Sequence, residues 1–366
     1  MKAVRLVSSL PLIALLVSCA GDASRSSDAS TSSGPLQLSG DPACSECRIT
    51  LSRVAALGHP SDPASVQSDA AATGCMVAAA SDSTFLVSGV VGGGEVFVYG
   101  RDGRVASSIG RRGAGPGEFG SSLRLMTAGD TVIVVDNSNT RIVTMDRNGA
   151  VLASFRLPSG INGFARLATG EYLLHGRPFV GPDQPLFRLL DDSGAEISNF
   201  GRSTQVAWDT DQWVISPAKS ADFWAASMWE YKLFRGWRDS LDVALVRDVD
   251  WFPSDNAWSE EILVTEPPSP LITYLHETDD RLLWVFVALA DPDWAPDIPD
   301  PGSAQWFRDS FDTMIEVIDL DEGRVLASHR FDDYLGGICG TKLVYAVTPA
   351  PDGDVTVSVF EPRLER

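Results

Sequence analysis

Short turns of the Asp/Asn–Gly type recur along the chain at a nearly constant spacing. Three of them end at Gly103, Gly149 and Gly194, a weaker one ends at Ser240, and successive turns lie 46, 45 and 46 residues apart. Turns of this type join antiparallel strands, because Gly and Asn tolerate positive φ. The segments between them are short apolar or alternating runs, such as Thr131–Asp136, which are typical of strands. A repeat of this length with four short strands has the size of one β-propeller blade.

The number of blades follows from the length of chain that carries the pattern. The pattern covers residues 44–366, and the next turn, ending at Gly323, comes 83 residues after Ser240, as expected if one unit carries a long insertion. Six blades fit this length when inserted loops are included. We therefore predict an all-β fold, a six-bladed β-propeller. Residues 333–364 hold only three strands of the last blade, and we expect Arg48–Leu57 to supply its outer strand and close the ring.

The second unit resembles a known repeat. Gly113–Phe119 carries the run Gly-Ala-Gly-Pro-Gly-Glu-Phe, and it is followed by the strand Thr131–Asp136, by Asn137–Val143 and by Asn148–Leu152. This succession resembles an NHL repeat, although the proline that often follows the Gly-Glu-Phe turn is absent. The NHL family forms six-bladed propellers. The whole chain is also similar to uncharacterised six-bladed propeller lipoproteins of environmental bacteria, a resemblance that implies a fold and no activity.

Residues 1–18 are predicted to be a lipoprotein signal peptide. Two basic residues precede the apolar run Leu6–Val17, which is too short to span a bilayer permanently. The sequence Leu-Val-Ser-Cys ending at Cys19 resembles the bacterial lipobox, and this implies cleavage before Cys19 and lipidation of its thiol. An ordinary cleavage site with an incidental cysteine is the alternative. Ala20, instead of Asp, follows the cysteine, which favours sorting to the outer membrane.

Residues 19–43 are predicted to be the lipidated cysteine and a disordered, Ser-rich tether, because the segment is almost free of apolar side chains. The folded domain is then residues 44–366. The formal net charge of −20 repels nucleic acid and anionic lipid. We therefore expect no nucleic-acid partner, and membrane contact only through the lipid. The predicted location is the bacterial cell envelope, at the outer membrane or the periplasmic side.

Four further cysteines, Cys44, Cys47, Cys75 and Cys339, remain for disulfides in an oxidising compartment. Four cysteines permit three pairings. Cys75 stands just before the first strand of blade one, and Cys339 ends the first strand of blade six. Because these blades are neighbours if the ring closes between them, we predict a Cys75–Cys339 bond, with Cys44 and Cys47 paired locally or free.

Ligand binding is predicted on the face that carries the long loops. Turns between first and second strands, and between third and fourth strands, share the opposite face and are short. The long segments are 110–122, 176–184, 201–212, 251–270 and 290–311. Long loops on a rigid scaffold are common binding sites. The residues assigned to this site are Arg112, Asn137, Arg177, Trp258, Trp294 and Trp306. For the three tryptophans, a core role and a contact role are equally reasonable.

The preferred function is a lipid-anchored, extracytoplasmic binding or interaction module for a protein, peptide or carbohydrate, which uses the long-loop face around blades four and five. The alternative is a propeller hydrolase or lyase at the channel mouth, because some NHL-type propellers are metal-dependent lyases. No catalytic residue is assigned.

Metal-ligand patterns are weak. The four histidines, His59, His175, His276 and His329, lack short ligand spacing, and only His276, on an innermost strand of blade five, is placed for the channel. Asp136–Asn139 and Asp291–Asp293 offer oxygen ligands without an EF-hand pattern. Calcium is therefore the one cofactor considered, and no metal ligand is assigned.

Overall fold

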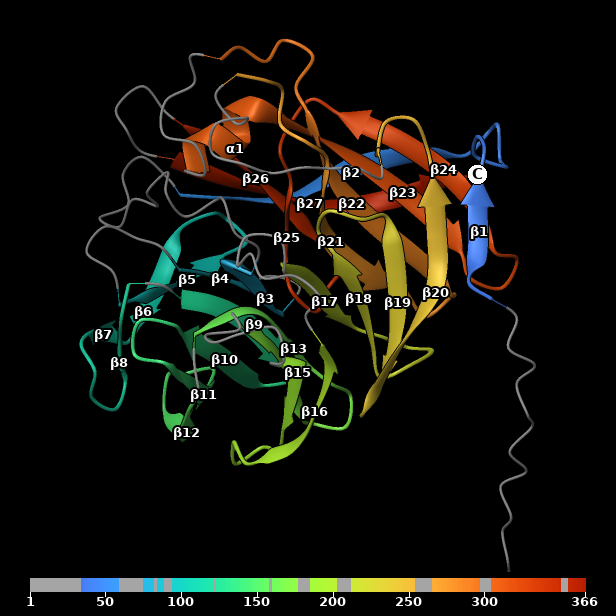
Figure 1. The fold of residues 1–366 in the computed structure, drawn as a ribbon. Helices are drawn as coiled ribbons and strands as arrows, with labels where there is room; N and C mark the ends of the chain where they lie inside the picture. Colours follow the sequence, from blue (N-terminus) through green and yellow to red (C-terminus); the bar gives the residue numbers. More distant parts are fainter. Residues whose placement is uncertain are drawn as a thin grey trace, which may run out of the picture. The chain divides into compact units, whose positions relative to one another are not determined.

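A computed structural model describes residues 34–58, 75–81, 84–88, 94–121, 123–157, 160–176, 185–202, 212–253, 265–296, 304–349 and 355–366. In the compact unit Pro35–Arg366, six blades of four antiparallel strands follow one another around a ring (Figure 1), and a fifth strand is added to one of them. The predicted all-β, six-bladed propeller is confirmed. Within the described residues, no helix is long and apolar enough to cross a bilayer.

The first three blades run in chain order from the channel outward. Blade one is β3 (Val77–Ser81), β4 (Thr84–Val87), β5 (Val96–Gly100) and β6 (Val105–Ile109). Blade two is β9 (Leu123–Ala128), β10 (Thr131–Asp136), β11 (Arg141–Asp146) and β12 (Val151–Arg156). Blade three is β13 (Ile161–Arg166), β14 (Tyr172–Gly176), β15 (Pro185–Leu190) and β16 (Glu196–Arg202). Between blades one and two, β7 (Arg111–Arg112) pairs with β8 (Glu118–Phe119).

Blades four and five keep the same order, and blade six is completed from the N-terminal side. Blade four is β17 (Trp213–Pro217), β18 (Phe223–Ser227), β19 (Lys232–Trp237) and β20 (Ser240–Asp248). Blade five is β21 (Leu271–Glu277), β22 (Leu282–Ala290), β23 (Phe311–Asp319) and β24 (Arg324–Phe331), with α1 (Ala304–Ser310) before β23. Blade six is β25 (Gly336–Gly337), β26 (Val344–Pro349), β27 (Val355–Glu365) and β2 (Arg48–Leu57).

Burial follows the position of a strand in its blade. The second strand of blade five, β22, is buried from Leu282 to Leu289, because both of its faces pack against neighbouring blades. The outermost strand of blade two, β12, is exposed at Val151 and Leu152. This gradient places the core between the blades and leaves the outermost strands more exposed to solvent.

The ring closes as the sequence predicted. Strand β2, Arg48–Leu57, pairs antiparallel with β27 and becomes the outer strand of blade six. Two disulfides are present, Cys44–Cys47 and Cys75–Cys339, and the second joins the inner ends of blades one and six. This is the pairing expected from a seam between these blades. Because distant parts of the chain meet at the seam, both devices resist opening of the ring.

One strand lies where a disordered tether was expected. β1 (Leu36–Ser39) adds parallel to β20 as a fifth strand of blade four. Leu38 is buried, and the buried Arg247 donates from Nη1 to the carbonyl oxygen of Gly40 at 3.0 Å while it pairs with Glu316 at 2.9 Å. The apolar alternation of Leu36 and Leu38 is too short to be recognised within the polar sequence around it, so the tether prediction is wrong for these residues.

Candidate functional site

A cavity of about 560 Å³ lies at one mouth of the central channel, and its volume is typical of small-molecule sites. Five blades line it with the inner ends of their first strands and the turns that follow. The lining includes Ala128 of blade two, Arg166 and Thr169 of blade three, Lys219 of blade four, His276 of blade five and Gly340 of blade six. Each of these turns joins a first strand to a second strand. The cavity therefore opens on the short-turn face, opposite the face predicted to bind ligand.

Blades three and four contribute one cation each. The Arg166 guanidinium lies over the Tyr172 ring, 4.7 Å from its centroid, and its Nη1 donates a hydrogen bond to the Tyr172 hydroxyl. Lys219 Nζ lies 3.0 Å from Asp279 Oδ1, and both of these side chains are largely exposed. The first cation is thus fixed by an aromatic ring, whereas the second is held only by a solvated ion pair.

Blade five contributes His276, whose imidazole is half-buried in the cavity wall. No hydrogen bond or ion pair joins this ring to another of the described residues. Burial, and then the positive charges of Lys219 and Lys342, lower its pKa to about 4, against smaller opposing effects of Asp279 and Glu277. The ring is therefore neutral at neutral pH, with one nitrogen able to donate and the other able to accept.

Glu277, the residue after His276, is 1% exposed and holds the turn of blade four against blade five. Its Oε2 accepts hydrogen bonds from the backbone nitrogens of Lys219 and Ser220, from Ser220 Oγ and from Trp224 Nε1. Burial alone would raise the pKa of Glu277, but the hydrogen bonds from Trp224, Lys219 and Ser220 together hold the pKa below its usual value. Glu277 therefore positions Lys219, and its Oε2 is already committed to protein donors.

None of the four predicted ligand-binding residues that the structure describes lines this cavity. Arg112 is exposed on β7. The Asn137 amide donates to the carbonyl oxygen of Ile161 at 3.0 Å and accepts from its nitrogen at 3.3 Å, so it ties blade two to blade three. Arg177 and Trp258 lie outside the described residues.

Two of the predicted tryptophans lie in the blade-five insertion. Trp306 is 1% exposed, and it packs edge-on against Phe307 and Phe311. Of the two roles considered for it, the core role holds, because α1 turns the ring onto the blades. Trp294 is half-buried, and its indole nitrogen has no hydrogen-bond partner among the described residues.

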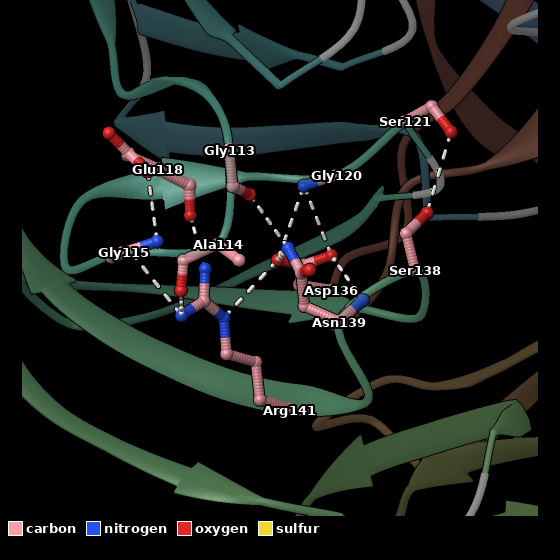
Figure 2. A network of polar contacts seen from close by, with 10 residues as sticks. All are labelled: Gly113, Ala114, Gly115, Glu118, Gly120, Ser121, Asp136, Ser138, Asn139 and Arg141. Carbon is pink, nitrogen blue, oxygen red and sulfur yellow. Dashed lines mark hydrogen bonds and ion pairs between the residues drawn. The ribbon is translucent and has the colours of Figure 1, made fainter.

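The loop between blades one and two is locked by Asp136 and Arg141 (Figure 2). The Asp136 carboxylate accepts from the backbone nitrogens of Gly120 and Asn139, from the Asn139 amide and from Arg141 Nε. These N–H donors occupy oxygen atoms that the sequence offered for calcium. Among the described residues, no group of three or more His, Cys, Asp or Glu side chains is placed to hold a metal ion.

Sequence reasoning identified His276 but missed the two cations that line the same cavity. Arg166 ends β13, and Lys219 follows β17 by two residues, so both occupy the inner end of a first strand. A charged residue at that position in successive blades is the signal that could have revealed them.

No family model and no curated protein matches the chain, so the NHL likeness remains a resemblance. Solved structures do match. A protein of Bacteroides fragilis named as exported is 13% identical, with a TM-score of 0.59 over 90% of this chain and 99% of that chain. A member of the DUF4221 family from Bacteroides vulgatus is 9% identical, with a TM-score of 0.56 over 87% and 99%. The likeness is one of fold. A virginiamycin B lyase of Staphylococcus aureus aligns with a TM-score of 0.45, too low to bear on function.

Proposed function

We propose that the protein is a lipid-anchored, extracytoplasmic binding module that takes a small ligand at the short-turn mouth of its channel. The observation that carries the proposal is the cavity of about 560 Å³, which five blades line and whose wall holds His276, an imidazole with no hydrogen-bond partner among the described residues. The predicted signal peptide and Cys19 support the location, as does the likeness in fold to a protein named as exported.

The polar groups in the cavity wall make better contacts with a ligand than with bulk water alone. His276 is half-buried, has no hydrogen-bond partner among the described residues and shares the cavity wall with Arg166 and Lys219. Its imidazole gains when a polar group of a ligand meets it. The scaffold around it is rigid, because the turns at Thr169 and Thr341 are closed by backbone hydrogen bonds, Gly170 N to Leu167 O and Thr341 N to Ile338 O. Such a site binds without having to order itself first.

Native mass spectrometry of protein purified gently from its own envelope tests the proposal, with Ala168→Trp as the blocking variant. Ala168 is exposed and lines the cavity, so an indole there fills the mouth without entering the core. Ala153→Trp, on the exposed outer strand β12, is the matched control. We expect a bound mass that Ala168→Trp removes and Ala153→Trp retains. Equal retention by both variants would place the ligand elsewhere.

The anchor is tested separately. Changing Cys19 to Ser should release the protein from the membrane fraction, because the acidic chain offers no other attraction to lipid. A variant that still sediments with membranes after a carbonate wash would contradict lipid anchoring.

Two other functions are distinguishable from this one. A hydrolase or lyase at the same mouth would use neutral His276 as a base, and it would turn over the ligand that co-purifies with a His276→Gln variant. Docking of a protein or carbohydrate through Trp258 and Trp294 on the long-loop face is a separate prediction, and Ala168→Trp would leave it intact.

A further inference from the structure

We infer that the ligand of the channel-mouth cavity is an organic anion with an apolar body, whose charged group lies between Arg166 and Lys219. This inference rests on the proposed function and specifies the class of ligand. It follows from the distribution of charge and of apolar surface around the mouth.

On the cationic side of the cavity, Arg166 has N–H donors that no described residue accepts from. Arg166 donates one hydrogen bond to the Tyr172 hydroxyl, and no ion pair joins it to a carboxylate among the described residues. A guanidinium carries five N–H donors, so several stay available to an oxyanion. Placement over the Tyr172 ring holds the guanidinium in a fixed orientation.

Lys219 is held by a partner that an incoming anion can replace. Its side chain is 56% exposed, and that of its partner Asp279 is 90% exposed. An ion pair this exposed contributes little, because water and salt screen it. The Asp279 carboxylate therefore takes, at the edge of the mouth, the position beside Lys219 that the anionic group of a ligand would take.

The other carboxylate of the wall, Glu277, does not cancel the positive charge that Arg166 and Lys219 present to the cavity. Glu277 Oε2 accepts four hydrogen bonds, and Oε1 lies 3.3 Å from Arg281 Nη1. His276 adds no positive charge, since its low pKa keeps it neutral, but it can donate a hydrogen bond to an oxygen. In a chain of net charge −20, this arc of blades three to five is a local site for negative charge.

Blades two and six contribute apolar groups to the cavity wall. Met126, which is 3% exposed, and Ala128 line it from blade two. A Cβ atom placed on Gly340 would meet Met126 Cγ at 4.0 Å, so blade six continues the same surface. A sugar or an inorganic ion would leave this wall unmatched, whereas an organic acid covers it with its hydrocarbon part.

Three probes of one shape and different charge test the inference: 2-naphthoate, 2-naphthylmethanol and 2-naphthylmethylammonium. Their Kd values are measured by calorimetry with the full mature chain. We expect naphthoate to bind about three- to tenfold more tightly than the alcohol, and the ammonium to bind weakest. Between pH 5.5 and 8 the Kd of naphthoate should stay constant, because His276 stays neutral over that range.

Two substitutions should move the affinity for naphthoate in opposite directions. Lys219→Met should weaken it toward the level of the alcohol, with Arg166 retaining part of the preference, and Asp279→Asn should strengthen it about two- to threefold, because it frees Lys219. Both substitutions should change the Kd of the alcohol by less than they change the Kd of naphthoate. Lys232→Met is the matched control, since Lys232 is 44% exposed and pairs with Glu230 outside the cavity.

The results separate this inference from the proposed function. Equal binding of the three probes, or preference for the ammonium, would overturn the anion class while leaving a channel-mouth site, provided that Ala168→Trp abolishes the binding. If no probe binds, the charge of the co-purified mass decides: an anion supports the inference, and a neutral or cationic molecule overturns it. Absence of any ligand that Ala168→Trp displaces would overturn both.

Discussion

Replacement of Glu277 by Ala tests how the mouth of the channel is held. The Glu277 side chain connects blade five to the turn of blade four that carries Lys219. Its removal leaves the donors of Lys219, Ser220 and Trp224 without their acceptor. The two turn residues can recover hydrogen bonds from water, because Lys219 is exposed. The Trp224 indole cannot, because Trp224 is 1% exposed.

The expected loss can be built from these contacts. One buried donor left unsatisfied costs about 1–3 kcal/mol, and a hydrogen bond to a charged group contributes about 1.5–3 kcal/mol. Since the solvent-accessible bonds recover most of their energy, we expect Glu277→Ala to lower the free energy of unfolding by about 3–4 kcal/mol. Glu277→Gln, which retains an acceptor, should lower it by about 1–2 kcal/mol.

Urea unfolding followed by circular dichroism measures both variants, with Glu230→Ala, whose partner is the exposed Lys232, as the control. The control should change stability by less than about 0.5 kcal/mol. A double-mutant cycle of Glu277→Ala with Trp224→Phe should give a coupling of about 1–2 kcal/mol. A loss below about 1 kcal/mol for Glu277→Ala, with no coupling to Trp224, would refute this account of the mouth.

The pH dependence of the same variants has a defined sign. The pKa of Glu277 is lowered from its usual value of 4.5, so its contribution is complete above that pH and disappears as pH falls through the lower, folded-state pKa. The stability difference between the wild type and Glu277→Gln should be constant from pH 6 to 8 and shrink below about pH 4.5. A difference that grows on acidification would contradict the direction of the shift.

Three further predictions concern the core, the channel and the seam. Trp306→Ala should lower the free energy of unfolding by about 3–5 kcal/mol, whereas Trp237→Ala, at a position 43% exposed, should lower it by less than about 1 kcal/mol. Equal effects of the two substitutions in urea unfolding would contradict a core role for Trp306. Arg124 lies half-buried on β9 with no hydrogen bond or ion pair to a described residue, and burial lowers its pKa to about 10. Arg124→Met should therefore raise the free energy of unfolding by about 1 kcal/mol. A fall in Tm would contradict this and indicate that the guanidinium has a stabilising partner. Loss of the Cys75–Cys339 bond in a Cys75→Ala, Cys339→Ala variant should lower the free energy of unfolding by about 2–3 kcal/mol. This is less than the roughly 5 kcal/mol of the chain-entropy model, because β2 also closes the ring. An unchanged midpoint of urea unfolding would contradict a structural role for the bond.

The sequence predicted the fold well, because the determinants of a blade are local. Gly149 and Gly194, which end two of the recurring turns, have φ values of 85° and 86°, so the turns require the residue type that marked them. The closing strand β2 was recognisable because the last blade had too few strands. By contrast, β1 depends on the distant Arg247 and Glu316, whose role in holding a strand is not visible in either sequence segment.

The site was harder to predict than the fold. Loop length directed attention to one face, but the cavity on the other face arises where short turns of five blades converge, which no single repeat encodes. His276 was recognisable because an innermost strand carries it. For Trp306, residue type did not distinguish a contact surface from the local core that α1 builds around its ring. Contact roles for Trp258 and Trp294 stay a prediction.

The most direct test of the channel-mouth site is the NMR signal of the His276 imidazole in the presence of the naphthalene probe that binds tightest. The chain has four histidines, so a His276→Gln variant assigns the resonance. We predict that the ring nitrogens of His276 shift in proportion to the bound fraction, that the other three histidines do not shift, and that Ala168→Trp removes the effect. Saturating binding that leaves the His276 resonances unchanged would contradict a ligand site at this mouth.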